Sequence, residues 1–243
     1  MSGRLRAMRF IAAGMAVGGI GFGLFTIVFG LLNPAQEPHA FHNPIVASLL
    51  IVLSAPPLIA IARDPARATR PLVMLTAIGV AALATMAIAL TLDPFTLPVV
   101  VLIGVLWALA PSRSQVMPPG RASLALIALS VLAAIVLVPY AVAQAELQRT
   151  DVSEHARFFH WVEMAFHATA IPLLGLLAGL RPAAYWMAGW MTGIALVVLG
   201  SASLLFGAYA SALPAAIAGG TVVGGLVFLG VTALESGRGA ANG

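Results

Sequence analysis

The sequence predicts an all-α integral membrane protein: a bundle of about eight transmembrane helices that forms one domain over residues 1–243. Hydrophobic residues make up 61% of the chain and charged residues only 8%, whereas soluble domains carry about 25% charged residues. So few charges do not cover a water-facing surface, and the lipid bilayer is therefore the expected surroundings. The apolar stretches also suit helices of ~20 residues, the length that crosses a hydrocarbon core.

Proline, glycine or charged residues bound each apolar stretch. The first stretch follows Arg4, Arg6 and Arg9 and is too long for the apolar region of a cleaved signal peptide, so we expect it to remain as a helix. The eight expected spans, in chain order, cover residues 10–32, 44–62, 71–92, 96–111, 122–142, 158–180, 184–207 and 213–234.

Arginine placement predicts that both termini are cytoplasmic. All twelve basic residues are arginines, and with this orientation only Arg149 and Arg157 fall on the outer side. Cytoplasmic loops of membrane proteins carry the excess of positive charge. We therefore expect a multi-pass protein of the plasma membrane (in bacteria, the inner membrane). The inner arginines are Arg4, Arg6, Arg9, Arg63, Arg67, Arg70, Arg113, Arg121, Arg181 and Arg238.

The two halves of the chain resemble each other weakly, which predicts a 4+4 internal repeat. Phe41-His42 opens the second span and Phe159-His160 opens the sixth. Each of these spans then carries a proline followed by leucine and ends in arginine near a proline. Chance similarity between apolar helices explains such matches equally well, so both readings stay open. A true repeat would place His42 and His160 at equivalent positions about a pseudo-twofold axis.

All five histidines fall on the extracytoplasmic side in this topology, and four of them, with one glutamate, form the expected metal site. His160, Glu163 and His167 stand at i, i+3 and i+7, so their directions fall within ~60° on one helix face. Glu163 is the only acidic residue inside an expected span, and ionisable groups inside membranes are functional candidates. His39 and His42 lie at the same membrane depth and are the expected partners.

His155 ranks below the other four histidines as a ligand. On a continuous helix it would point about 140° away from His160. The chain has no cysteine, so any metal is held by histidine, carboxylate or methionine. Imidazole suits copper, zinc and iron alike, and haem is the other expected cofactor, provided that its axial histidines come from opposite sides.

Several functions fit such a site: redox chemistry, assembly of an oxidase, or metal-dependent lipid chemistry. One alternative is a proton-coupled transporter that uses Glu163 and the histidines. Another is a non-catalytic subunit that binds other membrane subunits. No glycine-rich phosphate loop is present, and the arginines are spread over short loops. We therefore expect neither nucleotide nor nucleic acid as a partner, and the sequence does not decide whether the protein is an enzyme.

Overall fold

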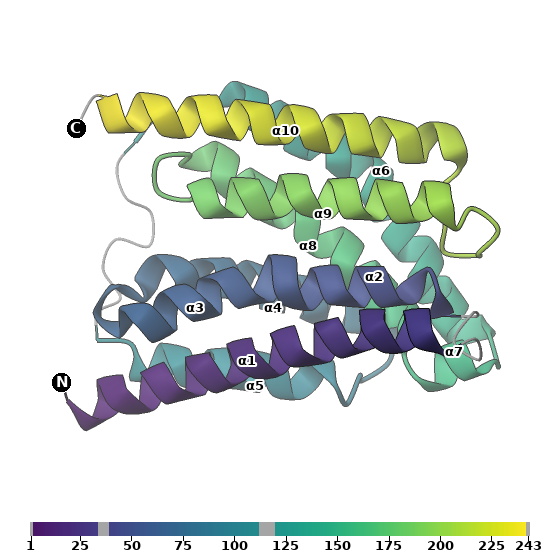
Figure 1. The fold of residues 1–243 in the computed structure, drawn as a ribbon, viewed down its shortest axis with the longest axis horizontal. Helices are drawn as coiled ribbons and strands as arrows, with labels where there is room; N and C mark the ends of the chain where they lie inside the picture. Colours follow the sequence, from purple (N-terminus) through teal and green to yellow (C-terminus); the bar gives the residue numbers. More distant parts are fainter. Residues whose placement is uncertain (1, 34–38, 112–119, 242–243) are drawn as a thin grey trace.

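The computed structural model describes residues 2–33, 39–111 and 120–241, and within these ranges the chain is helical without any strand. Seven helices are long and apolar enough to cross a membrane, and they lie side by side in one bundle (Figure 1). The predicted all-α membrane bundle is thus confirmed. The seven are α1 (Gly3–Leu32), the rod of α2, η2 and α3 (His42–Arg63), α4 (Thr69–Ala89), α6 (Leu124–Thr150), α8 (His160–Leu180), α9 (Trp186–Leu205) and α10 (Ala215–Ala241).

The remaining expected span, 96–111, is the shorter apolar helix α5 (Thr96–Leu109). Its 14 residues extend about 21 Å at 1.5 Å per residue, less than the ~30 Å of a hydrocarbon core. Asp93 caps its start by accepting hydrogen bonds from the backbone N–H of Phe95 and the hydroxyl of Thr96. Two short elements complete the fold: the 3₁₀ turn η3 (Pro65–Arg67) and the single helical turn α7 (Glu154–Arg157).

The second rod widens in its middle because of its two adjacent prolines. The rod begins as α2 (His42–Ala47), continues as the π-helix η2 (Ser48–Ser54) and ends as α3 (Ala55–Arg63). Pro56 and Pro57 have no N–H to donate to the preceding turn. The Ser54 hydroxyl donates to the carbonyl of Leu49 at 2.8 Å, five residues back. A π-helical segment inside an α-helix often accompanies a functional site. This one begins six residues after His42.

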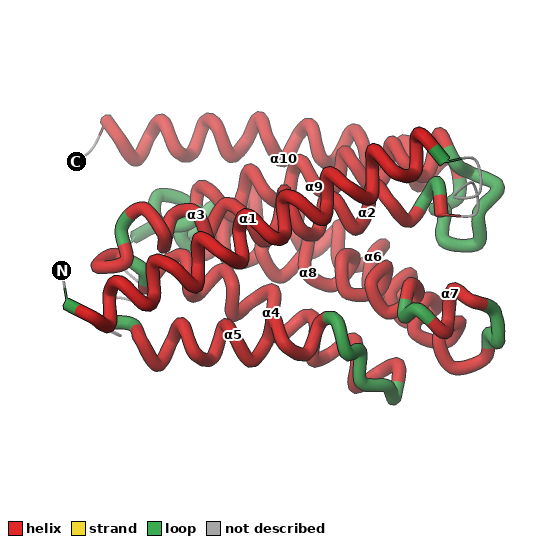
Figure 2. The backbone as a smooth tube through the Cα atoms, turned by 60° about the horizontal axis from the view of Figure 1, so that its bottom comes forward, coloured by secondary structure: helices red, strands yellow, loops and turns green. Residues whose placement is uncertain are grey.

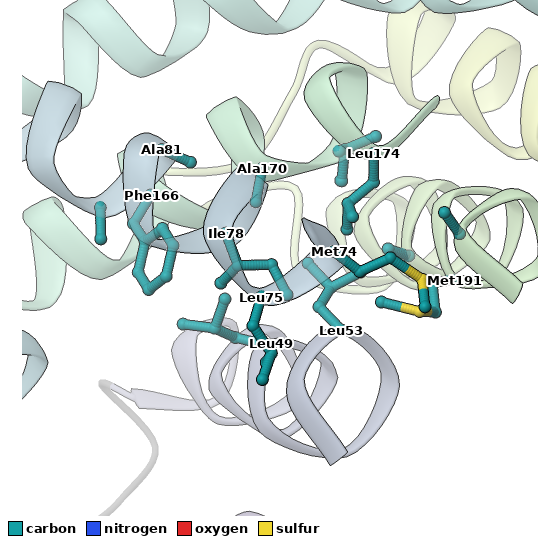
Figure 3. Close-up of a cluster of buried hydrophobic side chains, with 14 of the residues drawn as sticks. Leu49, Leu53, Met74, Leu75, Ile78, Ala81, Phe166, Ala170, Leu174 and Met191 are labelled. Carbon is teal, nitrogen blue, oxygen red and sulfur yellow. The ribbon is translucent and has the colours of Figure 1, made fainter. Parts of the chain in front are cut away.

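The central helix of the bundle is α8. It packs against α4, α6 and α9, whereas α1 and α10 lie at the periphery. Its contacts form a continuous apolar core with η2, α4 and α9, in which side chains from the four elements interlock (Figure 3). The labelled members are Leu49, Leu53, Met74, Leu75, Ile78, Ala81, Phe166, Ala170, Leu174 and Met191. The first turn of α8, which carries the candidate site, is therefore anchored to a rigid core.

The connections gather at the two ends of the bundle (Figure 2). Both chain termini lie at one end, and α7 lies at the other (Figure 1). Arginines at the end with the termini bond to nearby carbonyls: Arg4 donates to the carbonyls of Ala108 and Ala110, and Arg9 donates to the carbonyl of Arg63 at 3.3 Å. The histidine-rich segments are at the opposite end, together with Arg149 and Arg157.

Glycine permits the close approach of α9 and α10. A Cβ atom at Gly225 would lie 2.8 Å from the carbonyl oxygen of Gly193 and 2.9 Å from the backbone nitrogen of Val197. Gly220 and Gly224, which form a small-xxx-small pair on the same helix, instead have open space where a Cβ would be. Small residues allow backbones to approach in membranes, and here the residue that does so is the next glycine along.

We expect Gly225→Ala to destabilise the bundle and Gly224→Ala to leave it unchanged or more stable. Both changes add the same methyl group and gain up to about 1 kcal/mol of helix propensity. Only at Gly225 does the methyl meet backbone atoms that cannot rotate away, at a cost of about 1–3 kcal/mol. Thermal unfolding in one detergent compares the two variants. Equal melting temperatures would contradict the packing described for α9 and α10.

Candidate metal centre

Four of the five histidines and Glu163 lie together at the end of the bundle that carries α7 (Figure 1). His39 belongs to the loop before α2, and His42 is the first residue of that helix. His155 belongs to α7, and His160 and Glu163 occupy the first turn of α8. The expected openings of these two helices, at His42 and His160, are confirmed.

An interruption of the helix between α7 and α8 brings His155 back towards His160. Phe159, between α7 and α8, adopts a left-handed conformation with φ of 63°. This conformation is uncommon for a bulky residue and costs free energy, and such strain concentrates at functional sites. Because α7 and α8 are not one continuous helix, the expectation that His155 points away from His160 is wrong. Their ring centroids are 5.3 Å apart.

The imidazole rings form one contiguous cluster around His160. The ring of His160 stacks on His42 with centroids 3.9 Å apart and meets His39 edge-on at 4.9 Å. His39 in turn stacks on His155 at 5.0 Å. On its other face His155 stacks on Trp161 at 5.3 Å. His160 is thus in ring contact with the three other histidines of the cluster.

Two sets of three residues place their ligand atoms within 4.8 Å of one another, as a metal site requires. One set is His42, His160 and Glu163, and the other is His39, His155 and His160. Ligand atoms on a metal with bonds of 2.0–2.2 Å lie at most about 4.4 Å apart, so small side-chain rotations bring either set onto an ion. In the first set, His42 Nε2 already lies 3.0 Å from Glu163 Oε2.

The histidines retain unused nitrogen atoms. Nδ1 of His39, His42 and His160 is buried and has no hydrogen-bond partner among the described residues. Burial, and to a lesser extent the neighbouring His155, lower the pKa of His39 below 6.5, while Glu154 acts in the opposite direction. A neutral imidazole is the form that binds a metal. Buried polar atoms without partners are rare in folded proteins, and these three nitrogens can accept a further bond.

His167, the fifth residue of the expected site, is not part of the cluster. It lies seven residues beyond His160 on α8, about 10 Å deeper along the helix axis. Its side chain is fully buried, and its Nε2 lies 3.0 Å from the Ser48 hydroxyl at the start of η2. The helical face that His160 shares with Glu163 does continue to His167, but the depth difference separates it from any ion that those two residues hold.

A set of hydrogen bonds centred on Asp151, which lies outside the membrane-spanning segments, supports the cluster; we call it the polar lock. Asp151 accepts hydrogen bonds from the hydroxyl and backbone N–H of Ser153 and from the indole N–H of Trp161 at 2.8 Å. The Ser153 hydroxyl in turn caps α7 by accepting from the N–H of His155. These bonds, the Ser153 bonds first, hold the pKa of Asp151 below 3.8. The lock therefore positions both the loop that carries His155 and the ring stacked on it.

Asp151→Asn is expected to lower the melting temperature at neutral pH and to flatten its dependence on acid. A carboxyl with a lowered pKa in the folded state stabilises the fold above pH 3.8, and this contribution is lost as the pH falls through the folded-state pKa. The variant lacks that titration. Melting curves between roughly pH 6 and pH 3 test this.

Asp64→Asn provides a control for Asp151→Asn. Asp64 is an exposed carboxylate at the other end of the bundle, paired with the exposed Arg67 at 3.6 Å. Exposed ion pairs contribute little to stability, so this variant should melt as the parent does. If the two variants showed the same pH dependence, the lock would have no special role.

The first set of three carries the composition of known reactive metal sites. Two imidazoles and one carboxylate are the ligands of some catalytic zinc sites and of non-haem Fe(II) sites, which leave positions open for water or substrate. Glu163 was identified from the sequence as the one acid inside an expected span, whereas the ring contact between His155 and His160 was not expected. Comparison with protein-family models, with curated proteins and with solved structures found no match to this chain.

Proposed function

We propose that this chain is a membrane metalloprotein that binds a divalent transition metal through His42, His160 and Glu163. The observation that carries the proposal is the convergence of these side chains, from the first turns of two helices, with ligand atoms within 4.8 Å of one another. His39 and His155 stack above them and supply further imidazoles to the same ion or to a second one.

The ligand chemistry favours zinc or iron, and copper in its divalent state. A carboxylate oxygen is a hard donor and suits Cu(I) poorly. The geometry favours an ion over haem. Two axial imidazoles bound to one iron keep their ring centroids on the order of 6 Å apart, given metal–nitrogen bonds of about 2 Å. The rings of His42 and His160 are stacked at 3.9 Å, which leaves no space for a porphyrin between them.

We place the metal on the extracytoplasmic side of the plasma membrane. Support comes from the arginines, ten of which the positive-inside rule assigns to the cytoplasmic face. Arg4, Arg9 and Arg63 lie at the end of the bundle remote from the histidines. Among the described residues, the cluster of ionisable side chains lies near one surface with an apolar core next to it, and this arrangement fits a surface metal site better than a path for ions through the bilayer.

Elemental analysis of the purified protein tests the proposal. After removal of metal by a chelator, the protein should take up zinc or Fe(II) in a stoichiometric amount and gain thermal stability, because a ligand that binds only the folded state stabilises it. A variant with His42→Ala and Glu163→Gln together should do neither. Metal uptake that is equal in parent and double variant would refute the assignment. An intense haem absorption band would instead assign haem as the cofactor.

A further inference from the structure

The candidate metal centre opens into a groove with a volume of about 430 Å³. Part of its wall is polar and belongs to the site: His39, His42, His160 and Glu163, together with Asn43. Three of the six remaining wall residues are phenylalanines, and the others are Thr26, Val46 and Glu154. Phenylalanine side chains come from α1, from the α5 start and from the α7–α8 break: Phe22, Phe95 and Phe158.

A second cavity, of about 280 Å³, adjoins the first and continues down the bundle. The two share Phe22, Val46, Phe95 and Glu163 in their walls. The second cavity reaches Ser54, twelve residues beyond His42 on the same rod, which corresponds to about 18 Å along the helix axis. Apart from Glu163, Ser54 and a threonine of α5, its described wall is apolar. The combined space is polar at one end and apolar along its length.

The groove is open towards the lipid. Its wall includes residues of α1 and residues at the start of α5, two helices that contact each other. Three of its wall residues remain accessible on the outer surface of the bundle: Phe22 is 56% exposed, Phe95 64% and Val99 36%. A molecule dissolved in the bilayer can therefore enter sideways, with its chain parallel to the helices and its head at the level of the histidines.

The charges of the wall select against an anionic head group. No arginine is among the described residues that line either cavity, whereas Glu154 and Glu163 both line the first. The two carboxylates offset the two positive charges of the proposed divalent ion, so a phosphate or carboxylate would find no net positive charge in the wall. A neutral head that both donates and accepts hydrogen bonds suits the imidazoles and the carboxylate. The phenylalanine rings around it suit a flat ring, since aromatic pairs gain about 0.5–1.5 kcal/mol beyond their buried area.

We propose that the groove binds a quinone or quinol with a long apolar chain, its ring beside Phe95 and its oxygens at His42 and Glu163. The chain lies along the second cavity towards Ser54. This inference deepens the proposed function, on which it rests, because the residues that hold the metal are those that meet the head group. It names the class of small molecule that the metal centre receives.

Binding of decylubiquinone to the purified, detergent-solubilised protein tests the proposal. Val99→Trp fills the second cavity without touching any histidine, and it should weaken decylubiquinone binding at least about tenfold, equivalent to 1.4 kcal/mol. Val131→Trp makes the same change on α6, at a residue that is 47% exposed and lines neither cavity, and it should bind as the parent does. Both variants should keep the parent's metal content.

Two further ligands test which class of molecule the groove binds. A quinone ring without a chain should bind more weakly than decylubiquinone to the parent and should be insensitive to Val99→Trp. Dodecyl phosphate should fail to compete. Competition by dodecyl phosphate at equal concentration, or equal loss of affinity in the two tryptophan variants, would overturn the proposal. If the protein binds metal but no quinone, this inference alone is refuted. If it binds quinone but no metal, the proposed function is refuted, and the groove remains a quinone-binding site.

Discussion

Replacing His160 with alanine is expected to abolish metal binding. His160 is the one residue common to both sets of converging ligands, and its ring contacts those of His39, His42 and His155. Without it, each set retains only two ligands, fewer than the three protein ligands of a typical catalytic zinc site. Elemental analysis after exposure to zinc or Fe(II) should show the loss, and the metal-induced rise in melting temperature should disappear.

His167→Gln provides the contrast. His167 belongs to the same helix and the same helical face, but it lies about 10 Å deeper and is bonded to Ser48. This variant should keep a stoichiometric metal even where loss of the buried contact lowers its melting temperature. Metal retained by His160→Ala would refute the assignment of the site. Metal lost equally from both variants would show that folding, not coordination, limits binding.

The helical spans could be predicted from the sequence because a spanning helix needs apolar side chains both where it faces lipid and where it faces protein. Helix limits set by charge or proline were closest: the predicted 44–62 and 96–111 became His42–Arg63 and Thr96–Leu109. The span 122–142 was too short, since α6 continues to Thr150 through residues polar enough to resemble a loop. Mean hydropathy does not reveal that α8 is central and α1 peripheral, because the buried α8 is the less apolar of the two, at 1.4 against 2.1.

The candidate site was predicted in part, by helical spacing. The i, i+3 relation correctly placed His160 and Glu163 together, since both belong to one regular helix. The same reasoning misplaced His155 because it assumed helix through Phe159, and a left-handed phenylalanine has no sequence signal of its own. It also included His167, because angular position around a helix says nothing of depth along it. Contacts between helices, such as His42 with Glu163, required the structure.

The second large effect concerns Glu163. Glu163→Gln is expected to abolish metal-dependent stabilisation while leaving the metal-free protein as stable as the parent, or more stable. Glutamine keeps the shape and still offers an oxygen and an N–H to His42. It removes a charge that is costly near a membrane interior but that a metal ion needs. For the parent, free metal at a hundred times its dissociation constant adds about 2.7 kcal/mol of stability, and this increment should vanish in the variant.

Asp93→Asn should show the opposite pattern. Asp93 is fully buried and close in sequence to the groove, but it caps α5 through Phe95 and Thr96 and belongs to neither ligand set. Loss of its charge-assisted hydrogen bonds should lower the melting temperature of the metal-free protein and leave the metal-dependent increment intact. Melting curves of parent and both variants, each with and without zinc, give the comparison. If Glu163→Gln kept the full increment, Glu163 would be a partner of His42 and not a metal ligand.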